Sequence, residues 1–181
     1  AMEGEDDDSK DNRAFGSRPL WQRIVVVVSG ASMNILTGFI IVLALTCASQ
    51  AIASTTVAKF DKEATSNAAG GMQVGDVITR VNGANVHVST DIMYDLVLSN
   101  NGVVDLQVKR NGKLMDLKNV HFPMVDSGNG DKVMRRDFYV QPEEKTVFNV
   151  IHESFYQTVS MVRLVWMTFV ELFKGRFGLK D

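Results

Sequence analysis

The residues best suited to chemistry are the three histidines and their neighbours. His152 and Glu153 begin the pattern His-Glu-x-x-His, in which two histidines one helical turn apart bind zinc and the glutamate acts as general base. The second histidine is missing, because residue 156 is tyrosine. His87 and His121 fall in or beside predicted strands, where surface histidines are the ordinary case. The histidines therefore predict no metal site in this chain.

The patterns of other catalytic and ligand-binding sites are also incomplete in this sequence. No serine stands in the G-x-S-x-G context of a nucleophile. The pair Gly70-Gly71 lacks the Lys and Ser/Thr that follow a phosphate-binding loop. The acidic run 3–11 lacks the Gly and terminal Glu of a calcium loop and is typical of a solvated tail. We predict no catalytic residue within the sequence.

The chain contains a long uncharged segment, which is the element that would fix its position at a membrane. No charged side chain occurs between Ile24 and Ala58, and about 20 apolar helical residues suffice to cross a bilayer. We predict a transmembrane helix at 24–53, preceded by a lead-in, 1–23, whose Trp21 and Arg23 suit the headgroup region. A buried helix of a soluble protein is the less favoured alternative.

Charge fixes the expected orientation and excludes one class of partner. Basic residues are more frequent before the apolar segment than just after it, which predicts a cytoplasmic N-terminal side and an external C-terminal side. The residues compared are Lys10, Arg13, Arg18 and Arg23 before it, and Lys59 and Lys62 after it. The net charge of -2, without a basic stripe, predicts no nucleic-acid partner. The lone cysteine, Cys47, excludes an intrachain disulfide.

Asn34 is a full amide inside the apolar segment, and a polar group there requires a partner. Two interpretations are open: an interhelical hydrogen bond, or a polar group that faces a substrate cavity. The residue is our candidate for a cavity-facing position.

Residues 54–123 change to the pattern of strands and tight turns that predicts a small α+β domain, a partly open barrel. Asn82-Gly83 and Asn111-Gly112 suit hairpin turns that require positive φ. Between the hairpins, a helix at 90–98 is predicted, capped by Ser89 or Thr90.

The rest of the chain is predicted to contain a connection and a second long helix. Residues 124–145 are polar and are interpreted as a linker. Residues 146–174 combine aromatic residues at helical spacing with charged interruptions, which favours an amphipathic helix lying in the membrane interface over one that crosses it with Arg163 buried. Residues 175–181 begin a further segment.

The stretch NAAGGMQVGDVITRVNGANV, 67–86, resembles the signature of bacterial PDZ domains. The matching positions are Ala68, Gly70, Gly75, Asp76, Ile78, Asn82 and Gly83. The resemblance implies a domain that binds an extended peptide as an added strand beside its second helix. Our peptide-binding candidates on that helix are Ile92, Met93 and Leu96. A loop that captures a terminal carboxylate is not evident near TTVAKF.

The flanks resemble the RseP-type site-2 proteases, intramembrane zinc metalloproteases of bacteria. The shared pattern consists of Gly4-Glu5-Asp6, Arg13-Ala14-Phe15, Trp21-Gln22-Arg23-Ile24 and the segment from Gly30 to Asn34, with Ala31 in place of the usual Pro. The resemblance implies zinc in the parent protein, held by a His-Glu-x-x-His helix upstream and an Asp downstream. It also implies that this chain is an inactive internal portion.

These features lead to a hypothesis and two alternatives. The chain is expected to be the central part of a multi-pass protease of the bacterial inner membrane, with an extracytoplasmic PDZ domain. That domain would filter single-span membrane proteins already trimmed on the outside. The runner-up is a non-enzymatic, membrane-anchored PDZ adaptor of a secretion or envelope system, whose gene would contain no His-Glu-x-x-His. A PDZ-bearing serine protease ranks third.

Overall fold

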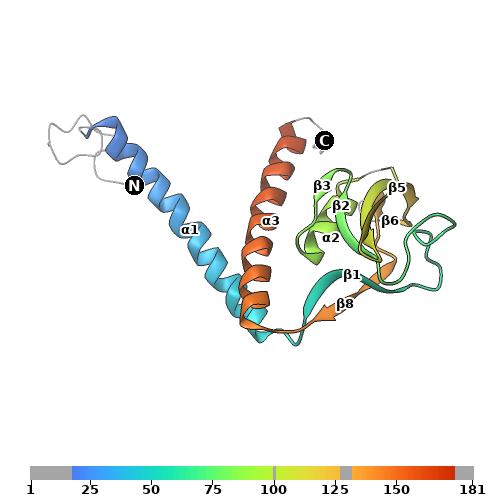
Figure 1. Ribbon diagram of the computed structural model, residues 1–181. Coiled ribbons are helices and arrows are strands. Elements are labelled where there is room, and N and C mark those ends of the chain that lie inside the picture. The colour runs from blue at the N-terminus through green and yellow to red at the C-terminus, as the bar shows by residue number, and fades with distance from the viewer. Residues whose placement is uncertain (1–17, 100, 127–131, 174–181) are drawn as a thin grey trace. The chain divides into compact units, whose positions relative to one another are not determined.

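The computed structural model describes residues 18–99, 101–126 and 132–173. The chain divides into two compact units, Ala1–Ile41 and Val42–Asp181. Figure 1 shows the order of the elements along the chain, a long helix followed by a β-rich region and a second long helix. Most of the predicted lead-in, 1–17, and the predicted segment 175–181 lie outside the described residues.

The first element is α1, Leu20–Ala48. It begins directly after Pro19, whose carbonyl accepts the N–H groups of Gln22 and Arg23, as suits a residue with fixed φ at a helix start. The predicted range, 24–53, was wrong at its C-terminal end, because Ile52 already belongs to a strand. An uncharged sequence continues across the boundary, so composition alone did not reveal it.

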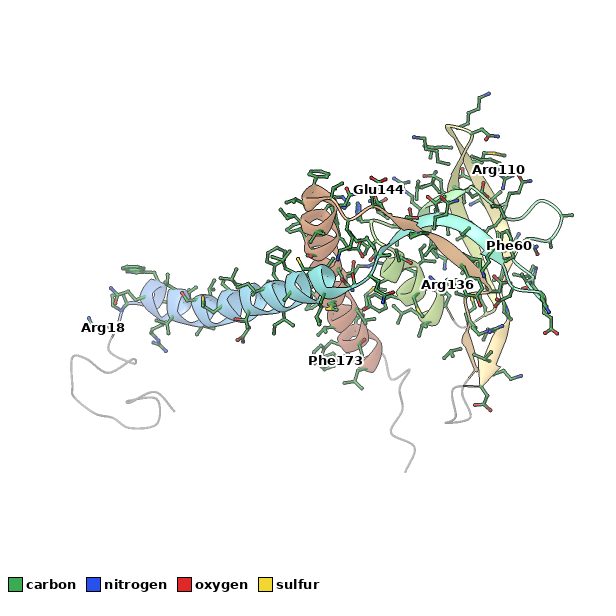
Figure 2. All side chains as sticks on the ribbon, turned by 90° about the horizontal axis from the view of Figure 1, so that it is seen from below. Arg18, Phe60, Arg110, Arg136, Glu144 and Phe173 are labelled. Atoms are coloured by element: carbon green, nitrogen blue, oxygen red, sulfur yellow. The ribbon has the colours of Figure 1, made fainter. Side chains whose placement is uncertain are left out.

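The side chains of α1 project on all sides of the helix, as Figure 2 shows, and most are exposed. Two of its hydroxyl groups donate within the helix, Ser29 to the carbonyl of Val25 and Ser32 to that of Val28. Among the described helices, only α1 is long and apolar enough to cross a bilayer. The prediction of one long apolar helix followed by a β-rich region is confirmed.

The β-rich region is built on one antiparallel sheet with the order β5-β4-β2-β1-β8, and the short β3 pairs with β2. The strands of the predicted hairpins are β1 (Ile52–Phe60), β2 (Val77–Val81), β3 (Ala84–Asn85), β4 (Val103–Arg110) and β5 (Lys113–His121). Asn82 and Gly83 have φ of 48° and 81°, and Asn111 and Gly112 have 49° and 80°. Both Asn-Gly pairs therefore form the turns predicted for them.

A buried ion pair fixes the turn that leads into β2. Asp76 is fully buried, and its two carboxylate oxygens accept from Nε and Nη2 of Arg110, both at 2.7 Å. Arg110 also donates to the carbonyl of Gly71. The bidentate geometry compensates the charge that burial would otherwise destabilise.

The short helix α2, Ser89–Val97, packs against β1, β2 and β7 (Lys132–Met134). Its Ile92 and Leu96 are each 1% exposed and join the hydrophobic core that the sheet encloses. The expectation that Ser89 or Thr90 caps the helix was wrong. Val88 is the N-cap and makes no side-chain cap, while Oδ2 of Asp91, in the first turn, accepts the N–H groups of His87 and Val88.

Residues 124–145, predicted to be a linker, contain β6 (Met124–Asp126), β7 (Lys132–Met134) and β8 (Phe138–Glu143). Residues 127–131 of this segment lie outside the described part. β6 and β7 form a hairpin, and β8 pairs with β1 from Ile52↔Glu143 to Phe60↔Phe138. The buried carboxylate of Asp137 accepts from the N–H groups of Thr65 and Ser66 and from the Ser66 hydroxyl. This contact between distant segments holds β8 in the sheet, and no local pattern announces it.

The last element is α3, Val147–Phe173. Its side toward the rest of its unit is partly polar, since Ser154 and Ser160 are 0% and 5% exposed. Its opposite side is apolar and exposed. That side consists of Phe148, Ile151, Phe155, Val159, Val162, Trp166, Phe169 and Phe173. The usual arrangement, with the apolar side of a helix toward the protein, is therefore reversed.

Candidate functional site

The candidate site lies at β8, one of the two edge strands of the described sheet, where residues of β8 and α2 line a common cavity. An edge strand carries N–H and C=O groups on its free side, and it can accept a further strand. Beside it lies a cavity of about 460 Å³. The lining includes Val140 of β8, Thr90 and Met93 of α2, and Glu153 and Gln157 of α3. The arrangement can hold an extended chain against β8 and a side chain in the cavity.

The three predicted peptide-binding residues separate in the structure. Met93 lines the cavity and is 48% exposed. Ile92 and Leu96 face the other way, into the core, and are not available for contact in this conformation. Helical periodicity identified the apolar residues of α2, but it does not distinguish a side that packs on a sheet from a side that borders a groove.

Two polar groups of the cavity wall lie at the start of α2. Arg136, which precedes β8, donates to the Ser89 hydroxyl at 3.3 Å, and Figure 2 shows its position near α2. The hydroxyl of Thr90 is buried and has no hydrogen-bond partner among the described residues. An unsatisfied buried hydroxyl is costly, and Thr90 is among the residues that line the cavity.

On the side of α2 away from the core, α3 packs in parallel along three layers. The imidazole of His87 stacks on Tyr156 with ring centroids 4.3 Å apart. One turn on, the Ser160 hydroxyl donates to Asp91 at 2.5 Å, and in the third layer Arg163 forms an ion pair with Asp95. The guanidinium also lies 4.0 Å from Asp91. We call this set of contacts the polar seam.

Negative charge exceeds positive charge along the polar seam. Asp91 and Asp95 are 2% and 6% exposed, and one oxygen of Asp95 lacks a partner. Burial raises the pKa of Asp95 to about 6, an effect that Arg163 opposes and Asp91 reinforces. Burial likewise raises the pKa of Glu153 to about 7, assisted by the charges of Glu143 and Asp91. Both shifts mean that the seam favours the protonated form of these carboxyls.

A second cavity of about 540 Å³ lies on the other side of Glu153. Its lining includes β1, the end of β8 and the start of α3, with His87 and His152 at its wall. Glu153 lines both cavities. Its side chain therefore lies where α3 separates the two hollows.

The start of α3 is joined to the end of α1 by one side chain. Lys145 donates from Nζ to the carbonyls of Cys47 and Ser49, both at 2.7 Å. Cys47 belongs to the last turn of α1 and Ser49 directly follows the helix, and at a helix end carbonyls lack partners within the helix and a cation is favoured. Lys145 therefore fixes the entry of α3 at the end of α1.

The amide of Asn34 is exposed on α1, and the structure gives it no hydrogen bond to another described residue. Within residues 18–99, 101–126 and 132–173, no three His, Cys, Asp or Glu side chains gather as metal ligands. The described residues therefore bring no set of zinc ligands together.

The sequence profile of Peptidase family M50 matches residues 1–181. The chain belongs to peptidase family M50. Among curated proteins it is 26% identical over 168 residues to the regulator of sigma-W protease RasP of Bacillus subtilis, covering 93% of this chain and 39% of that protein. It is 32% identical over 103 residues to the zinc metalloprotease RasP of Shouchella clausii, covering 57% of this chain and 24% of that protein.

A third relative in the family is the metalloprotease MmpA of Caulobacter vibrioides, 28% identical over 106 residues, which are 59% of this chain and 27% of that protein. The chain thus spans less than half of the length of each of these three relatives. Membership of family M50 confirms the predicted resemblance to site-2 proteases, and it implies zinc as the cofactor of the whole protein.

Several residues of the site escaped the sequence analysis. Arg136 and Lys145 carry no motif, and their roles depend on pairings between segments far apart in the chain. The contacts of the polar seam, by contrast, are indicated by charged residues in the sequence. Asp91 and Asp95 lie one turn apart on α2, and Arg163 interrupts an apolar helix, so matching charges could have paired the two helices.

Proposed function

We propose that this chain is the central portion of an intramembrane zinc metalloprotease, to which it contributes a transmembrane helix and a PDZ-like domain that filters substrates. The match to family M50 over residues 1–181 supports the enzyme class, and α1 supports the place in the membrane. The observation that carries the role of the domain is the edge strand β8 beside the cavity lined by Thr90 and Met93.

The ligand of the groove, in this proposal, is an extended peptide from a single-span membrane protein whose outer domain has been trimmed. Such a peptide adds to β8 through main-chain hydrogen bonds. A side chain then enters the cavity between Met93 and Gln157. Pro142 near the end of β8 lacks an N–H, so the pairing is limited to the earlier part of the strand.

The membrane placement follows from charge. The excess of basic residues before α1 places that side in the cytoplasm and the β-rich domain outside, in the inner membrane of a bacterium as part of a multi-pass protein. The apolar side of α3 would lie in the interface, where Trp166 is suited to the headgroup level. Lys145 supports this placement, because it joins the start of α3 to the end of α1.

The zinc ligands, in this proposal, come from other parts of the longer protein, and residues 1–181 alone are inactive. Asn34 would face the substrate cavity that neighbouring helices form in the whole enzyme. A free amide on an otherwise apolar helix supports this role, since polar groups at membrane depth face a partner or a cavity.

The test uses the full-length protein in proteoliposomes with two single-span substrates that differ only in the size of the outer domain. We expect one zinc per protein and cleavage of the short form alone. Removing the described domain between Ile52 and Glu143 should permit cleavage of both forms. A full-length protein that holds no zinc and cuts neither substrate would contradict the proposal and favour the adaptor.

A further inference from the structure

The contact between α2 and α3 has an unusual composition for two packed helices. Helices normally join through apolar side chains, but here the paired positions are His87 with Tyr156, Asp91 with Ser160, and Asp95 with Arg163. The strongly apolar side of α3 faces away. Val150, at the start of α3, is buried, but the attachment of α3 to α2 depends mainly on polar contacts.

Arg163 is the residue on which these contacts depend. It lies within 4.0 Å of Asp91 and forms an ion pair with Asp95. Without it, two carboxylates that are almost fully buried would face each other one helical turn apart. Leaving a buried charge without its partner is strongly unfavourable. The carboxylates would regain water if α3 moved away.

The position of α3 also controls access to the groove. Glu153 and Gln157 form one wall of the cavity whose other walls come from β1, α2, β8 and the end of α1. Gln157 and Ser160 lie on the same side of α3, one turn apart. Separation of the polar seam therefore removes the wall that borders Thr90.

From this geometry we propose that α3 is a latch over the β8–α2 groove, held by Arg163 between Asp91 and Asp95, and that its release exposes the cavity at Thr90. The ligand that the opened groove takes rests on the proposed function. The latch itself does not, because it depends only on contacts inside this chain.

The test measures how fast a small thiol reagent reaches the cavity. Thr90→Cys replaces a hydroxyl that has no partner among the described residues, and Cys47→Ala removes the native thiol. The probe is N-ethylmaleimide, applied to the whole chain in nanodiscs. Arg163→Met should accelerate labelling about tenfold or more, since the loss of a buried partner exceeds what one factor of ten requires.

Two further variants separate a latch from general unfolding. Lys118→Met removes an exposed partner of Asp105 and should leave the labelling rate unchanged. Adding Asp95→Asn to Arg163→Met removes one of the stranded charges and should slow labelling again, which unfolding would not do. Equal rates in Arg163→Met and the parent, or no recovery in the double variant, would overturn the latch. A fast, unlatched cavity that binds no peptide would leave the latch standing and count against the proposed function.

Discussion

The two long helices of this chain have similar lengths and opposite designs. α1, with 29 residues, is apolar on all sides, and the hydroxyls of Ser29 and Ser32 donate within the helix. α3, with 27 residues, keeps a partly polar side for the domain and an apolar side that the domain leaves exposed. The comparison shows that the apolar content of a helix does not by itself predict what surrounds the helix. The distribution of a few polar side chains decides whether lipid surrounds a helix or meets one side.

The largest difference between the helices should appear when each receives a charge. Leu36→Arg places a guanidinium in the middle of α1, where insertion becomes less favourable by about 3 kcal/mol. Val159→Arg on the exposed side of α3 should cost much less, because a side chain at the interface reaches water. Extraction of the chain from membranes at alkaline pH measures both. Equal extraction of the two variants would mean that α3 crosses the membrane as α1 does.

A smaller effect should follow from pH, and it should be confined to α3. The raised pKa values of Asp95, about 6, and Glu153, about 7, mean that the closed seam binds protons more tightly than the open one. The groups that face them are Asp91, Glu143 and Arg163, with His87 and Arg136 at the cavity walls. Protonation therefore favours closure, and the seam loses stability as pH rises from 3.8, the ordinary pKa of Asp95, to about 7, the raised pKa of Glu153.

Hydrogen exchange, corrected for its intrinsic pH dependence, provides the measurement. Protection of the α3 amides should be about tenfold greater near pH 5 than near pH 8, while the amides of α1 show no such change. Asp95→Asn should reduce the slope of the profile and leave the part that Glu153 contributes, and Asp105→Asn, at an exposed ion pair, should leave the slope unchanged. If the pH dependence of α3 protection keeps its full slope in Asp95→Asn, Asp95 does not contribute to the pH dependence of the polar seam.

The smallest effect should come from Asn34. An interhelical hydrogen bond in a membrane contributes on average about 0.6 kcal/mol, so Asn34→Ala in the full-length protein should change its abundance little. Its rate of proteolysis should fall more. Ser32→Ala is the matched control, because that hydroxyl is bonded within α1. Equal loss of activity and abundance in Asn34→Ala would make the residue structural.

The sequence predicted the parts of this fold that depend on local signals. The Asn-Gly turns, the strands between them and the apolar helix each follow from short-range chemistry. The end of α1 and the pairing of β8 with β1 were missed. Both depend on distant contacts, the first through Lys145 and the second through Asp137. A polar segment such as 124–145 reads as a loop unless its partner strand is known.

Less of the candidate site than of the fold could be predicted, because contacts between distant segments decide which residues line the cavity. Met93 was identified together with Ile92 and Leu96, although only Met93 borders the cavity. Which side of α2 meets the core is set by the sheet beneath it. The wall that α3 supplies could not be placed before the charges of α2 and α3 were paired across nearly seventy residues of sequence.

The proposal on which the rest depends is that a substrate peptide binds in the groove between β8 and α2. It is tested most directly by a photo-crosslinking residue at Met93 in the full-length protein, with a single-span substrate present. Met115 on β5 is the matched control, since the two methionines are similarly exposed, at 48% and 41%. The account predicts a substrate adduct at position 93 and none at 115. Adducts at both positions, or at 115 alone, would contradict it.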